Sequence, residues 1–119
     1  MRICIPTVSD ASLAARVCPH FGSAPFFTVV DEATGAVEVV RNTHVEHVHC
    51  SCDPAAAVLT LGIGAVVCRG VGWRGLAMLE ERGVPVCRTE SWSAADALKA
   101  FRARHLSRAG SEHACRHEP

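Results

Sequence analysis

The stretch AVVCRGVGWRGLAMLEERGVPVC, residues 65–87, decides the fold class of this 119-residue chain. Its first four residues form a short apolar run of the length expected for a buried strand. A glycine-rich turn then opens a helix, which we expect to continue to about Arg82 and to end at Gly83. Residues 84–87 follow as a second strand. Two strands that flank one helix in this way run parallel with a right-handed crossover, so the stretch predicts an α/β fold.

Three further strands are expected before this stretch, at residues 2–6, 26–30 and 37–40. A turn joins the last two into a hairpin, and Gly35 supplies the positive φ that such turns need. Two further helices are expected, at residues 54–61 and from Ser93 to about His105. The predicted order is therefore β-β-β-α-β-α-β-α, with one mixed five-stranded sheet and helices that cover it.

Length and composition indicate one globular domain. The apolar fraction of 49% and the charged fraction of 20% are typical of a folded, soluble protein. The formal net charge is zero, so nothing overall favours binding to nucleic acid or to an anionic membrane. The chain shows no signal peptide and no apolar run long enough to span a bilayer. We expect a cytoplasmic protein, with an α/β domain at residues 1–106 and a flexible tail at residues 107–119.

The segment HVEHVHCSC, residues 44–52, concentrates the donors that soft and borderline metals prefer, imidazole nitrogen and thiolate sulfur. The chain has seven cysteines, an odd number, and no export signal, which favours metal binding or redox chemistry over a disulfide framework. The Cys-x-Cys spacing is tighter than that of zinc knuckles. The candidate metal ligands here are His47, His49, Cys50 and Cys52. The alternative is an exposed polar loop with small packing thiols.

A second thiol and imidazole occur in Cys18-Pro19-His20-Phe21-Gly22. The predicted topology brings this segment, residues 44–52 and the glycine-rich turn to one sheet edge, where α/β proteins bind ligands. Cys18 and His20 are therefore candidate ligands, although packing of Cys18 and hydrogen bonding of His20 to a loop carbonyl are alternatives. The amides of Gly70 and Gly72 could offset the charge of an anionic cluster.

The remaining cysteines are weaker candidates for metal ligands. We expect Cys4 and Cys87 to pack in the core, and Cys68 stands at the end of a strand, where a site role is the less favoured interpretation. The tail carries a His113-Ala-Cys115-Arg-His117 set, which we expect to be an unstructured terminus rather than an arm that adds ligands. No motif supports hydrolysis, and residues 70–75 lack the Walker ending, so we do not expect an enzyme.

The residues that point to a family are HFGSAPFF at residues 20–27, Asp31, Asn42, GVGWRGLAML at residues 70–79 and GVPV at residues 83–86. Together they resemble the dinitrogenase iron–molybdenum-cofactor biosynthesis family, which includes nitrogenase cofactor carriers and the small orange protein. The resemblance implies a ribonuclease-H-like, three-layer fold and non-catalytic binding of a metal–sulfur cluster. It also implies site roles for His20 and for the histidines of residues 44–49. Many relatives are glycine-rich where this chain has Cys50-Ser-Cys52, and many lack Cys18, which suggests a different or more covalently bound cluster.

The leading hypothesis is a carrier or scaffold for an iron–sulfur cluster or a molybdenum–iron or molybdenum–copper sulfide cluster. Its expected partners are metallocluster donor or acceptor proteins, and a homodimer that shares one cluster is an open alternative. Three other hypotheses remain: a binder of zinc or copper(I) ions, a redox protein that uses the Cys50–Cys52 thiol pair, and an interaction module for another metalloenzyme.

Overall fold

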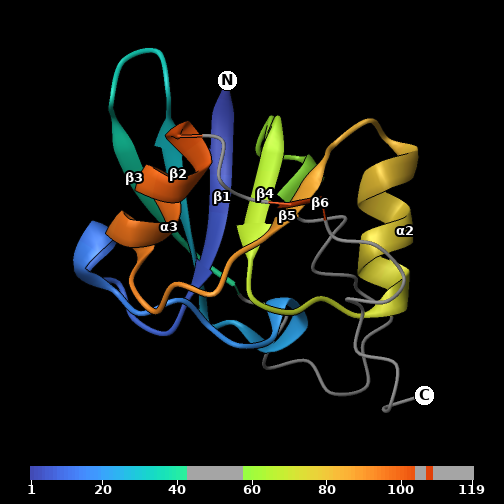
Figure 1. The fold of residues 1–119 in the computed structure, drawn as a ribbon, viewed down its shortest axis with the longest axis horizontal. Helices are drawn as coiled ribbons and strands as arrows, with labels where there is room; N and C mark the ends of the chain where they lie inside the picture. Colours follow the sequence, from blue (N-terminus) through green and yellow to red (C-terminus); the bar gives the residue numbers. More distant parts are fainter. Residues whose placement is uncertain (43–57, 104–106, 109–119) are drawn as a thin grey trace.

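The computed structural model describes residues 1–42, 58–103 and 107–108, and a mixed β-sheet forms its centre (Figure 1). The strands are β1 (Arg2–Thr7), β2 (Phe26–Asp31), β3 (Val37–Arg41), β4 (Ala65–Cys68), β5 (Val86–Arg88) and β6 (Ser107–Arg108). They lie in the order β3-β2-β1-β4-β5-β6. β1, β4 and β5 are parallel, whereas β2, β3 and β6 are antiparallel to their neighbours. The parallel β4–β5 pair confirms the fold class predicted from residues 65–87.

The five predicted strands are all present, and two differences from the prediction have local causes. The short strand β6 extends the sheet beyond β5 with Ser107 and Arg108, two residues that we expected in the tail. β5 begins at Val86 rather than at residue 84. The Val84 N–H instead donates to the Leu79 carbonyl (2.9 Å), and Pro85 has no N–H for the sheet.

The described helices are α2 (Trp73–Glu81) and α3 (Ala94–Arg102), with the 3-10 helices η1 (Ser12–Ala14) and η2 (Phe21–Ser23). α2 ends as predicted, because Gly83 follows its C-cap with φ of +78°, a left-handed conformation that favours glycine. Neither α2 nor α3, which belong to the described part of the chain, is long and apolar enough to cross a membrane.

The described residues confirm the other two predicted helices in part. Ser93 caps α3 as predicted, since its side-chain oxygen accepts a hydrogen bond from the Asp96 N–H at 3.1 Å. α3 ends at Arg102, and residues 104–106 lie outside the described residues. Residues 58–59 are helical, while residues 54–57 of the predicted helix also lie outside the described residues.

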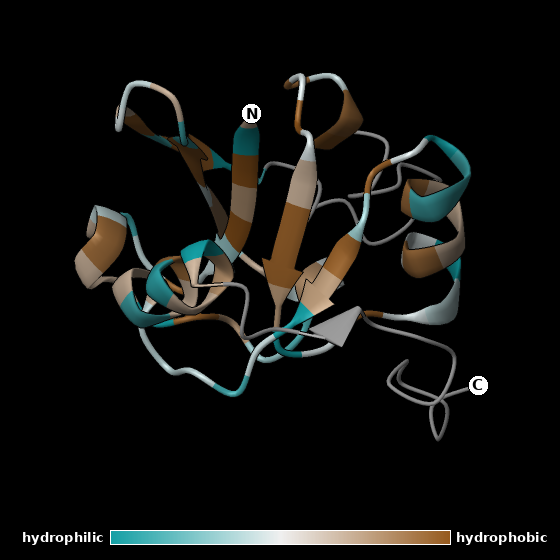
Figure 2. Cartoon of the chain, turned by 45° about the horizontal axis from the view of Figure 1, so that its top comes forward, coloured by the Kyte–Doolittle hydropathy of each residue, from teal (hydrophilic) through white to brown (hydrophobic). Residues whose placement is uncertain are grey.

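A hydrophobic core lies on each face of the sheet. Strand alternation separates the two cores: Cys4 of β1 packs in one, and Ile3 and Ile5 pack in the other. α2 covers the first core through residues such as Leu79, and α3 covers the second through residues such as Leu98. β4 is buried along its whole length between them, and Figure 2 shows this strand as hydrophobic. Because helices pack on both faces, the carboxyl ends of the parallel strands form an edge between the layers.

Candidate metal-binding site

The loop between β1 and β2 is attached to the carboxyl ends of three parallel strands. The Cys18 N–H donates to the Pro6 carbonyl of β1 at 2.9 Å, and the Phe21 N–H donates to the Gly70 carbonyl just after β4, also at 2.9 Å. The Val17 N–H donates to the Trp92 carbonyl after β5 at 2.7 Å. In Figure 1, η2 accordingly lies beside the ends of β1 and β4. The predicted meeting of the Cys18–His20 segment with the glycine-rich turn is confirmed.

His20 combines an exposed side chain with a firmly held main chain. Among the described residues, three donors reach its carbonyl oxygen: the Ser23 N–H at 3.3 Å, the Ser23 hydroxyl at 3.5 Å and the Cys18 thiol at 3.4 Å. The His20 main chain is therefore held at the sheet edge, while its side chain is exposed and accessible to a ligand.

Cys18 is only 5% exposed and belongs to the core under α2. Its thiol donates to the His20 carbonyl, so in this structure it supports the loop. To act as the metal ligand that the sequence predicts, the thiol would have to leave this bond and lose its proton. Ligation by Cys18 stays a prediction.

The end of β3 lies against the same loop. Asn42 is 4% exposed; its main-chain N–H donates to the Pro25 carbonyl at 2.9 Å, and its side-chain amide donates to the Ala24 carbonyl at 2.8 Å. The histidine- and cysteine-rich segment, residues 44–52, begins two residues further along the chain. The four predicted ligands in it, His47, His49, Cys50 and Cys52, lie outside the described residues.

The glycine-rich turn places the N-terminus of α2 at this edge. Gly72 is the N-cap, with no side-chain cap and no acidic residue in the first turn. A Cβ built on Gly72 would meet no atom of the described residues within 4 Å, so this part of the chain leaves the space beside it open. At Gly75, by contrast, a Cβ would lie 3.3 Å from Val71 Cγ2 and 3.9 Å from Phe21 Cδ2. Packing therefore favours glycine at position 75, whereas at position 72 it leaves room for an approaching group.

The other described cysteines are packing residues. Cys4 is fully buried, as predicted, and burial together with the neighbouring Cys68 raises the pKa of its thiol far above the ordinary range. Cys68 lies in the same core, and Cys87 is half-buried against the other. Within residues 1–42, 58–103 and 107–108, no three metal-ligand side chains gather into a group.

At the same edge, Arg69 and Trp92 form a contact that the sequence did not predict. The Arg69 guanidinium lies 3.7 Å from the centre of the Trp92 ring and donates to the carbonyls of Glu90 (2.5 Å) and Ser91 (3.3 Å). It thereby joins the end of β4 to the loop before α3. Trp92 directly precedes an N-cap residue, but its pairing with a residue 23 positions earlier has no local sequence signature.

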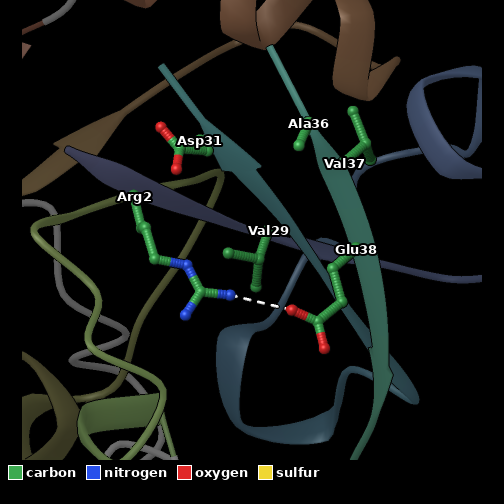
Figure 3. A pocket seen from close by; sticks show the side chains of 6 residues that line it. All are labelled: Arg2, Val29, Asp31, Ala36, Val37 and Glu38. Carbon is green, nitrogen blue, oxygen red and sulfur yellow. Dashed lines mark hydrogen bonds and ion pairs between the residues drawn. The ribbon is translucent and has the colours of Figure 1, made fainter. Parts of the chain in front are cut away.

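A pocket of about 290 Å³ lies at the β2–β3 hairpin, at the opposite end of the sheet (Figure 3). It is lined by Arg2, Val29, Asp31, Ala36, Val37 and Glu38. Arg2 forms an ion pair with Glu38 at 2.8 Å and also donates to the Leu61 carbonyl at 2.6 Å. This pocket is therefore separate from the edge that carries His20.

The family model of the dinitrogenase iron-molybdenum cofactor family matches residues 1–104. The chain belongs to this family. Among solved structures, the apo orange protein of Desulfovibrio gigas is 26% identical, with a TM-score of 0.81 and 92% of each chain covered. A Thermotoga protein provisionally described as NifB is 28% identical, with a TM-score of 0.78, and the match covers 90% of this chain and 91% of that one.

An uncharacterised protein of Methanocaldococcus jannaschii is similar in sequence. It is 23% identical over 105 residues, which is 85% of each chain. The family predicted from the sequence is thus confirmed over residues 1–104, and the family and its solved members point to a cofactor-related role.

Proposed function

We propose that this chain binds a metal–sulfur cluster, or a precursor of one, and carries or scaffolds it for other proteins. The observation that carries the proposal is the exposed His20, whose carbonyl is held by three hydrogen bonds at the sheet edge. The end of β3 meets the same edge, and the segment with His47, His49, Cys50 and Cys52 continues from it. Family membership and the likeness to the apo orange protein support a cofactor-related role.

Cys50 and Cys52 are the proposed primary thiolate ligands. His20 and one of His47 or His49 would ligate a metal or donate hydrogen bonds to cluster sulfides. Thiolates are the usual protein ligands of iron–sulfur clusters and also suit copper(I), and imidazole is an accepted second donor. The proposed ligands are thus mainly thiolate sulfur atoms, with imidazole nitrogen as the second type of donor.

Two supporting roles complete the proposed site. Cys18 would assist as a further thiolate once it had left the His20 carbonyl. The amides of Gly70 and Gly72 would offset the charge of an anionic cluster, and the open space beside Gly72 would let a bulky anion approach the backbone.

The proposed cargo is an iron–sulfur cluster or a molybdenum–iron or molybdenum–copper sulfide cluster. The proposed partners are proteins that donate or accept it, and two copies of the chain could share one cluster. We propose no catalytic step. A cytoplasmic setting suits Cys4 and Cys18, which are present as thiols, because thiols persist in reducing compartments. The mixed sheet with helices on both faces supports the ribonuclease-H-like assignment.

Anaerobic reconstitution with ferrous iron, sulfide and molybdate tests the proposal. We expect a coloured protein that contains metal and acid-labile sulfide. The double variant Cys50→Ser/Cys52→Ser should lose most of both, because serine hydroxyls are poor ligands for soft metals. The matched control is Cys87→Ser, which alters a half-buried thiol against the opposite core and should load like the wild type.

The other outcomes identify the alternatives. Zinc or copper without acid-labile sulfide in anaerobically purified protein would indicate a simple metal-ion binder. A reversible Cys50–Cys52 disulfide in protein without metal would indicate thiol redox chemistry. Full cluster content in the Cys50→Ser/Cys52→Ser variant would show that the proposed ligands are wrong.

A further inference from the structure

We infer that the pocket at the β2–β3 hairpin binds a primary alkylammonium ion, with the Asp31 carboxylate as its counter-ion. All the residues that line this pocket of about 290 Å³ belong to the described part of the chain (Figure 3). The pocket lies at the opposite end of the sheet from His20, so its ligand is independent of the proposed cargo.

Strand register places an apolar residue between the charged residues of the pocket. Arg2 lies opposite Asp31 in the β1–β2 ladder, and Val29 lies opposite Glu38 in the β2–β3 ladder. Because successive side chains of a strand point to opposite faces, Val29 and Asp31 lie on the same face of β2. Val29 is 1% exposed and belongs to the core under α2, so it forms an apolar floor for the pocket.

One wall of the pocket is an ion pair that already balances its own charge. Figure 3 shows the Arg2 side chain extended toward Glu38 rather than toward Asp31. Its Nη2 lies 2.8 Å from Glu38 Oε1, and its Nη1 donates to the Leu61 carbonyl at 2.6 Å. An anionic ligand would have to compete with Glu38 for this guanidinium. The pocket therefore disfavours anions.

Asp31 is the lining residue whose charge is left unbalanced. Its Oδ1 accepts hydrogen bonds from the Ala33 N–H at 2.9 Å and from the Thr34 N–H at 3.4 Å, both within the hairpin turn. Among the described residues, Oδ2 has no hydrogen-bond partner and the carboxylate forms no ion pair. A cation can therefore bind at Oδ2 through a charge-assisted hydrogen bond without breaking a bond of the fold.

The rest of the lining selects the kind of cation. A primary ammonium group is a compact charge with three N–H donors, which suits a carboxylate oxygen such as Asp31 Oδ2. A short alkyl chain on that group can pack against Val29 and Val37, which also line the pocket. The volume of about 290 Å³ is at the lower end of the range for ligand pockets, so the ligand is small.

The experiment titrates the isotope-labelled full chain with n-butylammonium chloride and follows the amide chemical shifts by NMR. We expect saturable shifts at residues 29–38, with a dissociation constant on the order of 1 mM, as suits so small a ligand. Two probes of similar size test the role of charge: butyrate is an anion, and n-pentanol is neutral. Each should bind about tenfold more weakly or not at all, because neither supplies the charge-assisted hydrogen bond.

The diagnostic variant is Asp31→Asn. Asparagine retains a side-chain oxygen for the Ala33 and Thr34 N–H groups, so the turn is preserved while the negative charge is removed. Binding of n-butylammonium should weaken about tenfold. The matched control is Glu32→Gln, which removes the same charge from the next residue, an exposed one that does not line the pocket. Its affinity should stay within about twofold of the wild type, because salt screens exposed charges.

Two further measurements complete the test. If Asp31→Asn does not fold, Ala36→Leu is measured in its place. Ala36 is exposed and lines the pocket, so a larger side chain takes up part of its volume and should weaken binding. The source of the ammonium group is identified with N-acetyl-lysine methylamide: tighter binding than n-butylammonium assigns the pocket to a lysine side chain of a protein, and weaker binding assigns it to a free amine.

Three outcomes would overturn the inference. The first is an absence of saturable shifts at residues 29–38. The second is equal affinity in the wild type and Asp31→Asn, or an equal loss in Glu32→Gln, since binding would then reflect only the overall charge of the chain. The third is tighter binding of butyrate than of n-butylammonium, which would assign the pocket to an anion held by Arg2.

Discussion

Burial decides the role of Cys4 and Cys18, two cysteines in the described part of the chain. Cys4 is enclosed in the core and Cys18 donates its thiol hydrogen to the His20 carbonyl, so both side chains support the fold in this structure. A neutral buried thiol is a small apolar side chain, and making it a metal ligand requires loss of a proton in a medium that disfavours charge. Burial thus favours a packing role over metal ligation for Cys4.

The buried thiol of Cys4 should make stability depend on alkaline pH. Burial raises the pKa of this thiol above its ordinary value of 9.0, so the folded protein keeps a proton that the unfolded chain releases above that pH. Stability from this group is complete below pH 9.0 and declines as the pH rises through it. We expect the free energy of unfolding to fall by about 1 kcal/mol between about pH 8 and pH 10 because of Cys4.

Urea denaturation at the two pH values measures this effect, with Cys4→Ala as the comparison. The variant is expected to be less stable at both pH values, because it leaves a small cavity, but to show a flatter pH dependence. An identical decline in wild type and variant would contradict the assignment to Cys4.

At the scale of elements, the ends of helices and strands build the candidate site. The carboxyl end of β1 binds the Cys18 N–H, the turn after β4 binds the Phe21 N–H, and the start of α3 is bridged to Arg16 through Ser93. A loop attached at several element ends has few alternative conformations, which explains how His20 can be exposed and still be held in place.

The N-cap of α3 should contribute measurably to stability. Ser93→Ala removes the acceptor for the Asp96 N–H and should lower the free energy of unfolding by about 1 kcal/mol. Ser93→Asn preserves a capping oxygen without adding charge and should remain within a few tenths of a kcal/mol of the wild type. Chemical denaturation of the three proteins checks the expectation, and equal losses in both variants would show that Ser93 acts by another route.

At the scale of the whole molecule, one sheet is shared by two cores. Leu79 of α2 and Leu98 of α3 lie in different cores, yet β4 supplies Val66 to one and Val67 to the other. Loss of either core exposes one face of the same strands. The two layers should therefore unfold together.

Cooperative unfolding can be tested with one variant in each core. Leu79→Ala and Leu98→Ala should each cost about 3 kcal/mol, as large-to-small changes in cores do. Each should still unfold in one transition in which circular dichroism coincides with tryptophan fluorescence, since Trp73 is the first residue of α2 and Trp92 directly precedes the N-cap of α3. Separate transitions in Leu79→Ala would show that α2 is an independent unit.

Much of the fold could be predicted because its determinants are local. The crossover at residues 65–87, the end of α2 at Gly83 and the cap at Ser93 all follow from short patterns that act within a few residues. The predicted start of β5 is wrong because the Val84 N–H donates to the Leu79 carbonyl at the end of α2 instead of pairing in the sheet. The sequence predicted that the candidate site lies at the edge formed by the carboxyl ends of the parallel strands. It did not predict which residues contact one another at that edge.

By itself, the sequence determined the five strands from β1 to β5, the helices α2 and α3, their order, the family resemblance and the set of candidate donors, because each follows from local patterns along the chain. Only the tertiary structure decided that Cys18 is buried against the His20 carbonyl, that Arg69 stacks on Trp92 and that Asn42 joins the end of β3 to the His20 loop. Most of these contacts join segments far apart in sequence, and all depend on how the packed core orients the side chains. That orientation is decided by shape and burial in three dimensions rather than by any local pattern.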